Sequence, residues 1–285
     1  MTKIILVTGT STGLGVSIAV QAAQNGHVVY ATMRNTDRRS TLDTAALAAG
    51  VTVNVLQLDV QDAASVGAAV DQIIAAQGRI DVLINNAGMG FARSLEQAEE
   101  EDIQRIMDIN FMGVVRCTKA VLPHMRRARA GHVINISSVG GLVGQPFNEI
   151  YCGAKFAVEG FTESLACYVT PHFDIHFTAV EPGGIASEFA NTVLKQIADT
   201  GGMLEDEYLP ILRKYVSGSQ QRQGGSGAYQ TAEEVAQVVI DVLSSDTPPI
   251  RVRTSDWAEA LTALKTAADP DGRKMQTQVF GQFLA

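Results

Sequence analysis

Tyr151 and Lys155, four residues apart, are the residues of this chain best suited to chemistry. On a helix, residues four apart lie on one face, so the lysine ammonium would lie beside the phenol. A nearby positive charge favours the ionised form of a phenol and lowers its pKa. Such a phenol could exchange a proton with an alcohol or a ketone near neutral pH. Ser138, 13 residues before Tyr151, could bond the oxygen of such a substrate.

A Tyr-x-x-x-Lys pair is weak evidence by itself, because lysine is common and most such pairs lie on a solvated helix face. The position of this pair strengthens the hypothesis, since it opens the helix that follows the fifth predicted strand. Asn110 is a further candidate. It could hold a water that connects Lys155 to solvent, or it could be a polar residue satisfied within a helix packing surface.

A glycine-rich turn follows the first predicted strand and opens the first predicted helix. Glycine lets the backbone approach a pyrophosphate, and the free N–H groups of a helix start favour its negative charge. The spacing is G-x-x-x-G-x-G, which differs from the general G-x-G-x-x-G fingerprint. We therefore predict a dinucleotide that accepts or donates hydride. The predicted contacts in this turn are Gly9, Ser11, Thr12, Gly13, Leu14 and Gly15.

Arginine stands where an NAD site usually has an acid, about 20 residues beyond the glycine turn. No Asp or Glu occurs between Gly15 and Asp37, whereas Arg34 ends the second predicted strand with Arg38 and Arg39 close behind. A guanidinium suits the 2′-phosphate of NADP. The alternative is a solvated arginine cluster at a strand end. We predict NADP as the cofactor, with NAD less expected.

Two more segments could contact the dinucleotide. Asp59, followed by Val60, could bond the adenine amino group, or it could cap the helix that begins near Asp62. The segment 85–88 reads Asn-Asn-Ala-Gly, and its Asn86, Ala87 and Gly88 would suit a wall against the cofactor ribose. Asparagine and glycine also serve any tight turn, so both interpretations stay open.

Short β-branched runs alternate with longer segments of helical periodicity, which predicts a parallel sheet covered on both faces. The strands are almost continuously apolar, as expected when both faces are buried. We predict an α/β fold, a single doubly wound Rossmann-type domain over 1–285 with a seven-stranded parallel sheet. The predicted strands are 3–8, 27–32, 51–58, 81–85, 131–137, 174–181 and 250–253. The predicted helices are 14–25, 63–77, 100–127, 151–170 and 232–243.

Two segments depart from the alternation. An insertion at 183–230 holds a predicted short helix at 205–216, followed by a polar, glycine-rich stretch at 217–227 that we expect to be mobile. An insertion at the carboxyl end of a strand is where a substrate lid would lie. A structural excursion or a subunit contact is the alternative. The second segment is a C-terminal extension at 254–285, which holds the only tryptophan, Trp257.

Composition excludes several classes of protein. With 22 basic and 30 acidic residues the formal charge is −8, which argues against a nucleic-acid partner. Three cysteines suggest no disulfide framework, and no Cys/His spacing resembles a metal site. The N-terminus does not read as a signal peptide, and no segment approaches the roughly 18 apolar residues of a membrane span. We therefore predict a cytoplasmic protein without a metal.

Taken together, these motifs resemble those of the classical short-chain dehydrogenases/reductases in order and spacing, over almost the whole chain. They are TGTSTGLG at 8–15, NNAG at 85–88, Asn110, Ser138, Tyr151-x-x-x-Lys155 and Pro182-Gly183. The resemblance implies that Tyr151 donates or accepts the proton, while Lys155 lowers its pKa and binds the nicotinamide ribose. It also implies that Ser138 positions the carbonyl oxygen and that Asn110 maintains a water relay.

The resemblance extends the predicted cofactor site to the end of the sixth strand. Pro182, Gly183 and the backbone of Ile185 would flank the nicotinamide. Ser187 stands where the family usually has threonine and would keep the hydroxyl for the carboxamide. Family members usually associate through the two long helices, which implies a homodimer or a homotetramer.

Within the family, the chain is most similar to the 17β-hydroxysteroid and retinol dehydrogenase branch. That branch commonly uses NADP(H) and acts on bulky apolar alcohols and ketones. The estradiol-type enzymes use a histidine in the substrate loop and a glutamate before the Val-Phe-Gly of the tail. This chain has no histidine after His176 and has Gln278 at the glutamate position, so we do not expect an estradiol enzyme.

The sequence thus predicts an NADP(H)-dependent oxidoreductase that interconverts a hydrophobic alcohol and its ketone or aldehyde, with Tyr151 as the acid or base. A retinol or steroid dehydrogenase acting on lipids is the first alternative. A non-catalytic NADP(H) sensor is an alternative of another class. An intact set of Ser138, Tyr151 and Lys155 argues against it, because a sensor needs no proton relay.

Overall fold

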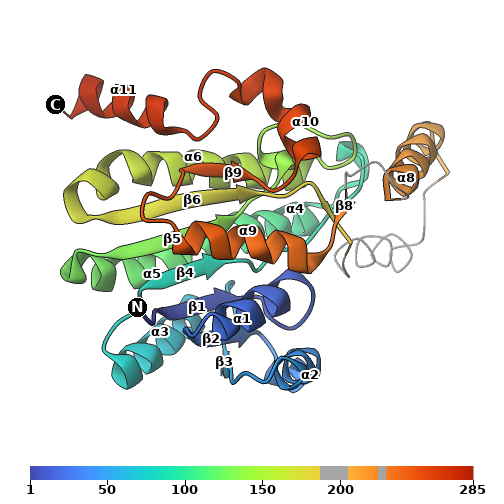
Figure 1. Cartoon of the computed structure of the whole chain (residues 1–285). Coiled ribbons are helices and arrows are strands. Elements are labelled where there is room, and N and C mark those ends of the chain that lie inside the picture. Colours follow the sequence, from blue (N-terminus) through green and yellow to red (C-terminus); the bar gives the residue numbers. More distant parts are fainter. Residues whose placement is uncertain (187–204, 224–228, 285) are drawn as a thin grey trace.

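A seven-stranded parallel sheet forms the centre of the protein (Figure 1). The computed structural model describes residues 1–186, 205–223 and 229–284. The strand order is β3-β2-β1-β4-β5-β6-β9, so the chain reverses its direction of travel across the sheet between β1 and β4. The predicted fold class is confirmed. The strands are β1 (Ile4–Thr8), β2 (Val28–Met33), β3 (Asn54–Gln57), β4 (Val82–Asn85), β5 (Gly131–Ile136), β6 (Ile175–Glu181) and β9 (Arg251–Arg253).

Two layers of helices cover the sheet, and each encloses an apolar core. Side chains of β1 alternate between them: Ile5 and Val7 pack into one core, and Ile4 and Leu6 into the other. Burial on both faces explains why the strands are apolar without interruption. The first layer holds α1 (Leu14–Gln24), α2 (Ser40–Ala48) and α9 (Ala232–Ser244). The second holds α3 (Ala63–Gln77), α5 (Gly113–Ala128) and α6 (Glu149–Phe173).

The helix predicted at 100–127 is interrupted. It consists of α4 (Glu100–Met107), a π turn at Asp108–Met112 and α5, and Asn110 lies in the π turn. A π turn adds a residue to the helical repeat and re-aims the side chains around it. Apolar periodicity does not reveal such a turn, because the pattern continues on both sides of it.

The described parts of the segment between β6 and α9 contain more regular secondary structure than the sequence predicts. Its two described ends pair as a small parallel sheet, β7 (Gly184–Ile185) with β8 (Tyr229–Gln230). Helix α8 (Leu209–Gln223) runs beyond the predicted 205–216, so 217–223 is helical where no helix was predicted. The expected mobility of this stretch stays a prediction, and 224–227 lies outside the described residues. Helix α2 was also not predicted, because its nine residues show little amphipathic contrast.

The C-terminal extension forms two helices, α10 (Asp256–Thr266) and α11 (Arg273–Phe283). Helix α11 lies along α6, on the outside of the second helical layer (Figure 1). Over the described ranges, no helix combines the length and the apolar character that a membrane crossing requires.

Gly9 and Gly26 permit a controlled test of the glycine turn. Both have positive φ angles, +71° and +78°, but a Cβ at Gly9 would lie 2.6 Å from Ala87 Cα, whereas nothing lies within 4 Å of one at Gly26. Gly26→Ala is expected to lower the free energy of unfolding by about 1–2 kcal/mol through backbone strain alone. Gly9→Ala adds a backbone clash and should cost roughly 1–3 kcal/mol more. Urea unfolding of both variants gives the comparison, and equal losses would contradict the close packing of Gly9.

Candidate active site

A cavity of about 1150 Å³ opens at the carboxyl ends of the strands, beside the point where the strand order reverses. In doubly wound sheets this crevice is where ligands bind. The predicted site residues line it, from the glycine turn to Tyr151, Lys155 and the backbone at Ile185, with two exceptions. Asn110 lies outside the lining, and Ser187 falls outside the described residues.

At one end of the cavity, the glycine turn interlocks with the loop that follows β4. Asn86 Nδ2 donates to the carbonyl oxygens of Thr8 and Gly9, at 2.9 Å each, and the N–H groups of Asn86 and Ala87 both donate to Thr8 Oγ1 at 3.0 Å. A Cβ on Gly15 would lie 2.3 Å from Gly9 O and 2.5 Å from Asn86 Nδ2. Only glycine therefore fits at position 15, where the first turn of α1 rests on this loop.

The glycine turn meets the requirements of a pyrophosphate. Gly13 caps α1 at φ 60° and ψ −138°, and as a glycine it offers no side-chain cap to the first N–H groups of the helix. Those N–H groups, together with the positive end of the helix dipole, favour a phosphate. The backbone there carries no Cβ at Gly9, Gly13 or Gly15 to obstruct it. The residues present thus fit the dinucleotide that the sequence predicts.

Two of the three arginines reach the cavity. Arg34 and Arg38 are exposed and line it, beside the glycine turn. Arg39 is turned away and forms an ion pair with Asp43, with N–O distances of 2.7 and 3.0 Å. Only two of the three predicted arginines therefore lie at the cavity, because Arg39 is the residue that precedes α2 and faces Asp43 on that helix.

Asp59 and Val60 also line the cavity, but Asp59 does not cap α3. The cap of α3 is Asp62, whose Oδ1 accepts a hydrogen bond from Ala64 N at 2.8 Å. Asp59 Oδ1 instead accepts from Gln61 N at 3.0 Å within the loop. The capping interpretation of Asp59 is wrong, and its carboxylate stays close to the cavity.

At the other end, Ser138 opens a 3₁₀ turn (Val139–Gly141) directly after β5. Its Oγ accepts a hydrogen bond from Gly140 N at 3.0 Å. Tyr151 and Lys155 lie one turn apart near the start of α6, with Lys155 Nζ 5.8 Å from the centre of the Tyr151 ring. Lys155 Nζ donates to Ile136 O, at the end of β5, over 2.7 Å. The strand end and the helix start thereby hold the three side chains together.

Burial dominates the acid–base properties of this pair. It raises the pKa of the Tyr151 phenol to about 12, although a hydrogen bond with Ser138 works in the opposite direction. It lowers the pKa of the Lys155 ammonium to about 8, with Glu159 offsetting part of the effect. In the protein without a bound cofactor, the expected lowering of the tyrosine pKa is thus outweighed by desolvation. The phenol is protonated at neutral pH, as a proton donor must be.

Asn110 is fully buried, and its side chain fixes the backbone of Met89. Oδ1 accepts from Met89 N and Nδ2 donates to Met89 O, both at 2.9 Å. A Cβ on Gly88 would lie 2.8 Å from Asn110 Oδ1 and 3.9 Å from Lys155 Nζ. Asn110 is therefore a buried polar residue whose side chain is satisfied by hydrogen bonds within the packing surface, as the second interpretation of the sequence predicted. A water relay through Asn110 stays a prediction.

The far wall of the cavity consists of residues that the sequence analysis did not assign to the site. Leu212 and Tyr215 come from α8, and Trp257 and Leu261 from α10. A lone tryptophan in an apolar tail was the available signal. Gln278, by contrast, is exposed on α11 and does not line the cavity, so the tail reaches the site through α10 instead.

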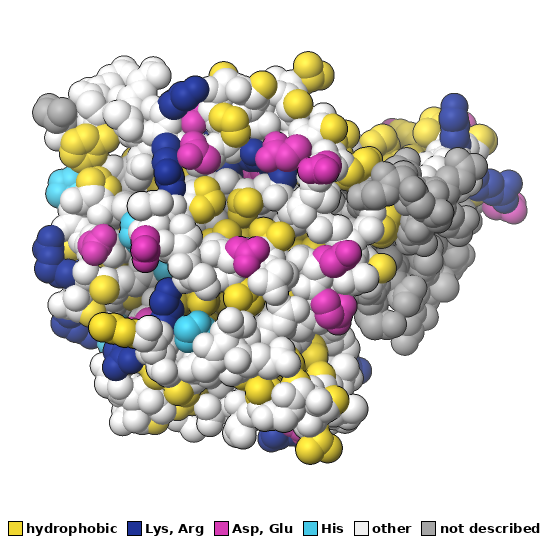
Figure 2. Space-filling model, in the orientation of Figure 1, with side chains coloured by type: hydrophobic (Ala, Val, Ile, Leu, Met, Phe, Trp, Pro, Cys, Tyr) yellow, Lys and Arg dark blue, Asp and Glu magenta, His cyan; other side chains and the backbone are white. Residues whose placement is uncertain are grey.

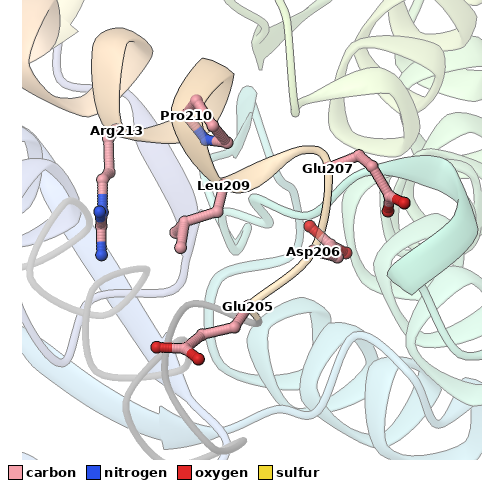
Figure 3. Close-up of a pocket in the computed structure, with 6 residues that line it drawn as sticks. All are labelled: Glu205, Asp206, Glu207, Leu209, Pro210 and Arg213. Carbon is pink, nitrogen blue, oxygen red and sulfur yellow. The ribbon is translucent and has the colours of Figure 1, made fainter.

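Among the described residues, we find no second cluster of charged side chains that resembles a binding site. On the face shown in Figure 2, Lys and Arg side chains are scattered among acidic and apolar ones. A separate hollow at the start of α8 is lined by residues between 205 and 213, but Glu205, Asp206 and Glu207 point in different directions (Figure 3). Within the described ranges, no group of three or more His, Cys, Asp or Glu side chains could hold a metal ion.

Comparison with known proteins identifies the class to which this site belongs. A family model described as short chain dehydrogenase matches residues 3–198. The chain therefore belongs to the short-chain dehydrogenase/reductase family. It is an oxidoreductase that acts on CH–OH groups, as its named relatives are dehydrogenases and reductases of this family.

Relatives with curated names cover nearly the whole chain. Retinol dehydrogenase 8 of Bos taurus is 40% identical over 95% of this chain and 86% of its own length. The 3-ketodihydrosphingosine reductase of Bacteroides thetaiotaomicron is 38% identical, covering 94% of each chain. The 17-beta-hydroxysteroid dehydrogenase type 1 of Homo sapiens is 36% identical over 98% of this chain and 86% of its own length. The predicted branch of the family is confirmed.

Solved structures share the fold. A short-chain dehydrogenase from Streptomyces avermitilis superposes with a TM-score of 0.77 at 26% identity, covering 99% of this chain and 98% of that one. Actinorhodin polyketide ketoreductase, in a variant solved with NADPH, gives a TM-score of 0.76 at 25% identity, covering 88% of this chain and 95% of that one.

The depressed pKa of Lys155 predicts a pH-dependent stability. Between about 8 and the ordinary 10.5, the unfolded chain holds a proton on this lysine that the folded chain has lost. Stability from this residue should therefore rise with pH across that window, by roughly 3 kcal/mol in total, and be lost as pH falls through 8. Urea unfolding at pH 7 to 10 should show this rise in the wild type but not in Lys155→Met. Lys119→Met, at an exposed position on α5, is the control and should follow the wild type.

Proposed function

We propose that the protein is an NADP(H)-dependent oxidoreductase that interconverts a hydrophobic alcohol and its ketone or aldehyde. One observation carries the proposal. The protonated phenol of Tyr151, the buried Lys155 ammonium and the Ser138 hydroxyl lie in the same cavity as a glycine cradle suited to a dinucleotide. Proton donor, hydride source and substrate oxygen would meet at one place.

In carbonyl reduction, Tyr151, Ser138 and Lys155 would each have a different role. When bound, NADPH supplies the hydride that adds to the carbonyl carbon. Tyr151 donates its phenolic proton to the carbonyl oxygen as negative charge develops there. Gly140 N donates to Ser138 Oγ, so the Ser138 hydroxyl keeps its own proton for the substrate oxygen or for Tyr151. The Lys155 ammonium, held by Ile136 O, stabilises the phenolate that remains.

Selection of NADP over NAD would depend on charge at the glycine end. Arg34 and Arg38 line the cavity there and would face a 2′-phosphate. A guanidinium binds a phosphate by charge-assisted, bidentate hydrogen bonds. The relative solved with NADPH supports the same choice.

Lipid alcohols or ketones are the second, narrower candidate for the substrate. Leu212, Trp257 and Leu261 give the far wall an apolar character over a volume that accepts a bulky molecule. The relatives named for retinol, 3-ketodihydrosphingosine and a 17-beta-hydroxysteroid favour this class. Gln278 does not line the cavity. Its replacement of the glutamate of estradiol-type enzymes therefore gives no structural argument against an estradiol substrate. Association as a homodimer or homotetramer and a cytoplasmic location stay predictions from the sequence.

Tyr151→Phe tests the proposed chemistry. We expect it to lower the rate of NADPH-dependent carbonyl reduction roughly 100- to 10,000-fold, because the proton donor is removed, while NADPH binding persists. The measurement is NADPH oxidation with a panel of retinal, steroid ketones and aryl ketones. Tyr168→Phe, at an exposed position further along α6, is the matched control and should retain wild-type rates. Comparable turnover by Tyr151→Phe would remove Tyr151 from the mechanism.

Arg34→Asp tests the choice of cofactor. The substitution should lower the ratio of kcat/KM for NADPH to that for NADH by roughly 100-fold, since a charged contact to the 2′-phosphate is lost and a repulsive one is introduced. Arg39→Asp, next to the cavity but already paired with Asp43, should leave the ratio unchanged. A wild-type enzyme that uses both cofactors with equal efficiency would contradict the charge argument.

A further inference from the structure

Two glutamates from different elements face each other beneath the catalytic turn. Glu159 lies on α6, one helical turn beyond Lys155, and Glu181 is the last residue of β6. They are 6% and 0% exposed, and their side chains are in hydrogen-bonding contact with each other. Neither lines the cavity, so neither is placed to touch a substrate or a cofactor.

A hydrogen bond between two carboxyl groups requires that one of them carries a proton, because ionised carboxylates only accept hydrogen bonds. Among the described residues, Oε1 of Glu159, Oε1 of Glu181 and the neighbouring Ser137 Oγ are all buried and form no well-aligned hydrogen bond, although the Ser137 hydroxyl is close enough to Glu159 to act on it. Two ionised carboxylates in contact would repel each other in a region from which water is excluded. If one carboxyl is protonated, it donates to the other, which removes both the repulsion and the missing hydrogen bond.

The remaining charge of the pair is balanced from the C-terminal side. Arg253 Nη1 lies 3.4 Å from Glu181 Oε2 and donates to Pro270 O at 2.7 Å, while Nη2 donates to Glu259 Oε1 of α10 at 2.8 Å. The other groups that act on Glu159 are Ser137 at the end of β5, Lys155 on α6 and Arg251 on β9, which is itself paired with Glu163.

The pair also lies against the backbone that carries the catalytic serine. A Cβ on Gly141 would lie 2.9 Å from Glu159 Cγ and 2.7 Å from Ser137 Oγ. Val139 N donates to Pro182 O at 2.9 Å, and Pro182 directly follows Glu181. The two carboxyls thus lie where the Ser138 turn, α6 and the Pro182 loop come together.

We propose that Glu159 and Glu181 share a single proton and act as positioning residues, which hold the Ser138 turn and the Lys155 turn of α6 in place from behind. Their effect on catalysis rests on the proposed function, whereas the shared proton does not. Through Arg253 and Glu259 the same pair connects the catalytic turn to α10, which supplies Trp257 and Leu261 to the far wall of the cavity.

The direction of the pH dependence follows from the pair. Burial and the neighbouring carboxyl raise the pKa of Glu181 well above its ordinary value of 4.5, and burial also raises that of Glu159. Above the ordinary value, the folded pair therefore holds a proton that the unfolded chain has released. The stability contributed by the pair decreases as pH rises, until the shared proton itself dissociates.

The first experiment measures Tm from pH 5.5 to 9 for the wild type, Glu181→Gln and Glu159→Gln. An amide supplies the donor permanently, so both variants should gain on the wild type as pH rises, by roughly 5 °C or more over this range. Asp71→Asn removes an exposed carboxylate on α3, a helix that contributes no group to the pair, and is the control that should run parallel to the wild type. Parallel curves for all four proteins would overturn the shared proton.

The second experiment tests positioning and compares Glu181→Ala with Glu181→Gln. Amide hydrogen exchange at 137–142 should be faster in the alanine variant and return to the wild-type rate in the glutamine variant. In carbonyl reduction, kcat should fall about 10-fold or more in Glu181→Ala, with KM for NADPH within twofold, and recover in Glu181→Gln. Unchanged exchange in Glu181→Ala would overturn the positioning role.

The two proposals fail separately in these measurements. A wild-type protein that reduces no carbonyl compound contradicts the proposed function, while the Tm and exchange measurements still decide the shared proton and the positioning. If Glu181→Ala does not fold, a second comparison replaces it. Amide hydrogen exchange at 137–142 is then measured above pH 9 in the wild type and in Glu159→Gln. Faster exchange in the wild type alone supports the proposal, and equal exchange overturns it.

Discussion

Removal of water from Tyr151 and Lys155 is the constraint on which the chemistry of this protein depends. It pushes the two pKa values in opposite directions, to about 12 for the phenol and about 8 for the ammonium. Both shifts favour the neutral side chain, because a low-dielectric environment disfavours charge. Burial in the cavity thereby keeps the Tyr151 phenol protonated at neutral pH.

Polar contacts at the two ends of the cavity hold the groups that meet there. At the glycine end, Thr8 and Asn86 fasten the two loops that would enclose a dinucleotide. At the reacting end, Lys155 bonds the end of β5, and Glu159 and Glu181 lie behind the Ser138 turn. These contacts join the end of β1 to the loop after β4, and the ends of β5 and β6 to α6. A parallel sheet makes this possible, because it gathers the carboxyl ends of its strands at one edge.

Periodicity and motif spacing predicted the parts of the fold that depend on continuous burial. Strand β1 was predicted because its residues form a continuous apolar run, and helix α3 because its apolar residues recur at helical spacing. The π turn at Asn110 was missed because the apolar pattern continues on both sides of it. The pairing of β7 with β8 was missed because its partners are distant in the sequence. Arg39 shows the same limit, since its partner Asp43 belongs to a helix that the pattern did not indicate.

The sequence by itself determined the class of the protein and indicated the residues that we propose as its reacting groups. The order of the glycine turn, Ser138, Tyr151 and Lys155 is a property of the chain, and the resulting register on a helix follows from local geometry. Only the tertiary structure decided the protonation of those groups and the shape of the cavity around them. Burial, and the approach of Glu159 to Glu181 or of Trp257 to the cavity, arise when separate elements pack together. Spacing along one chain does not encode such contacts.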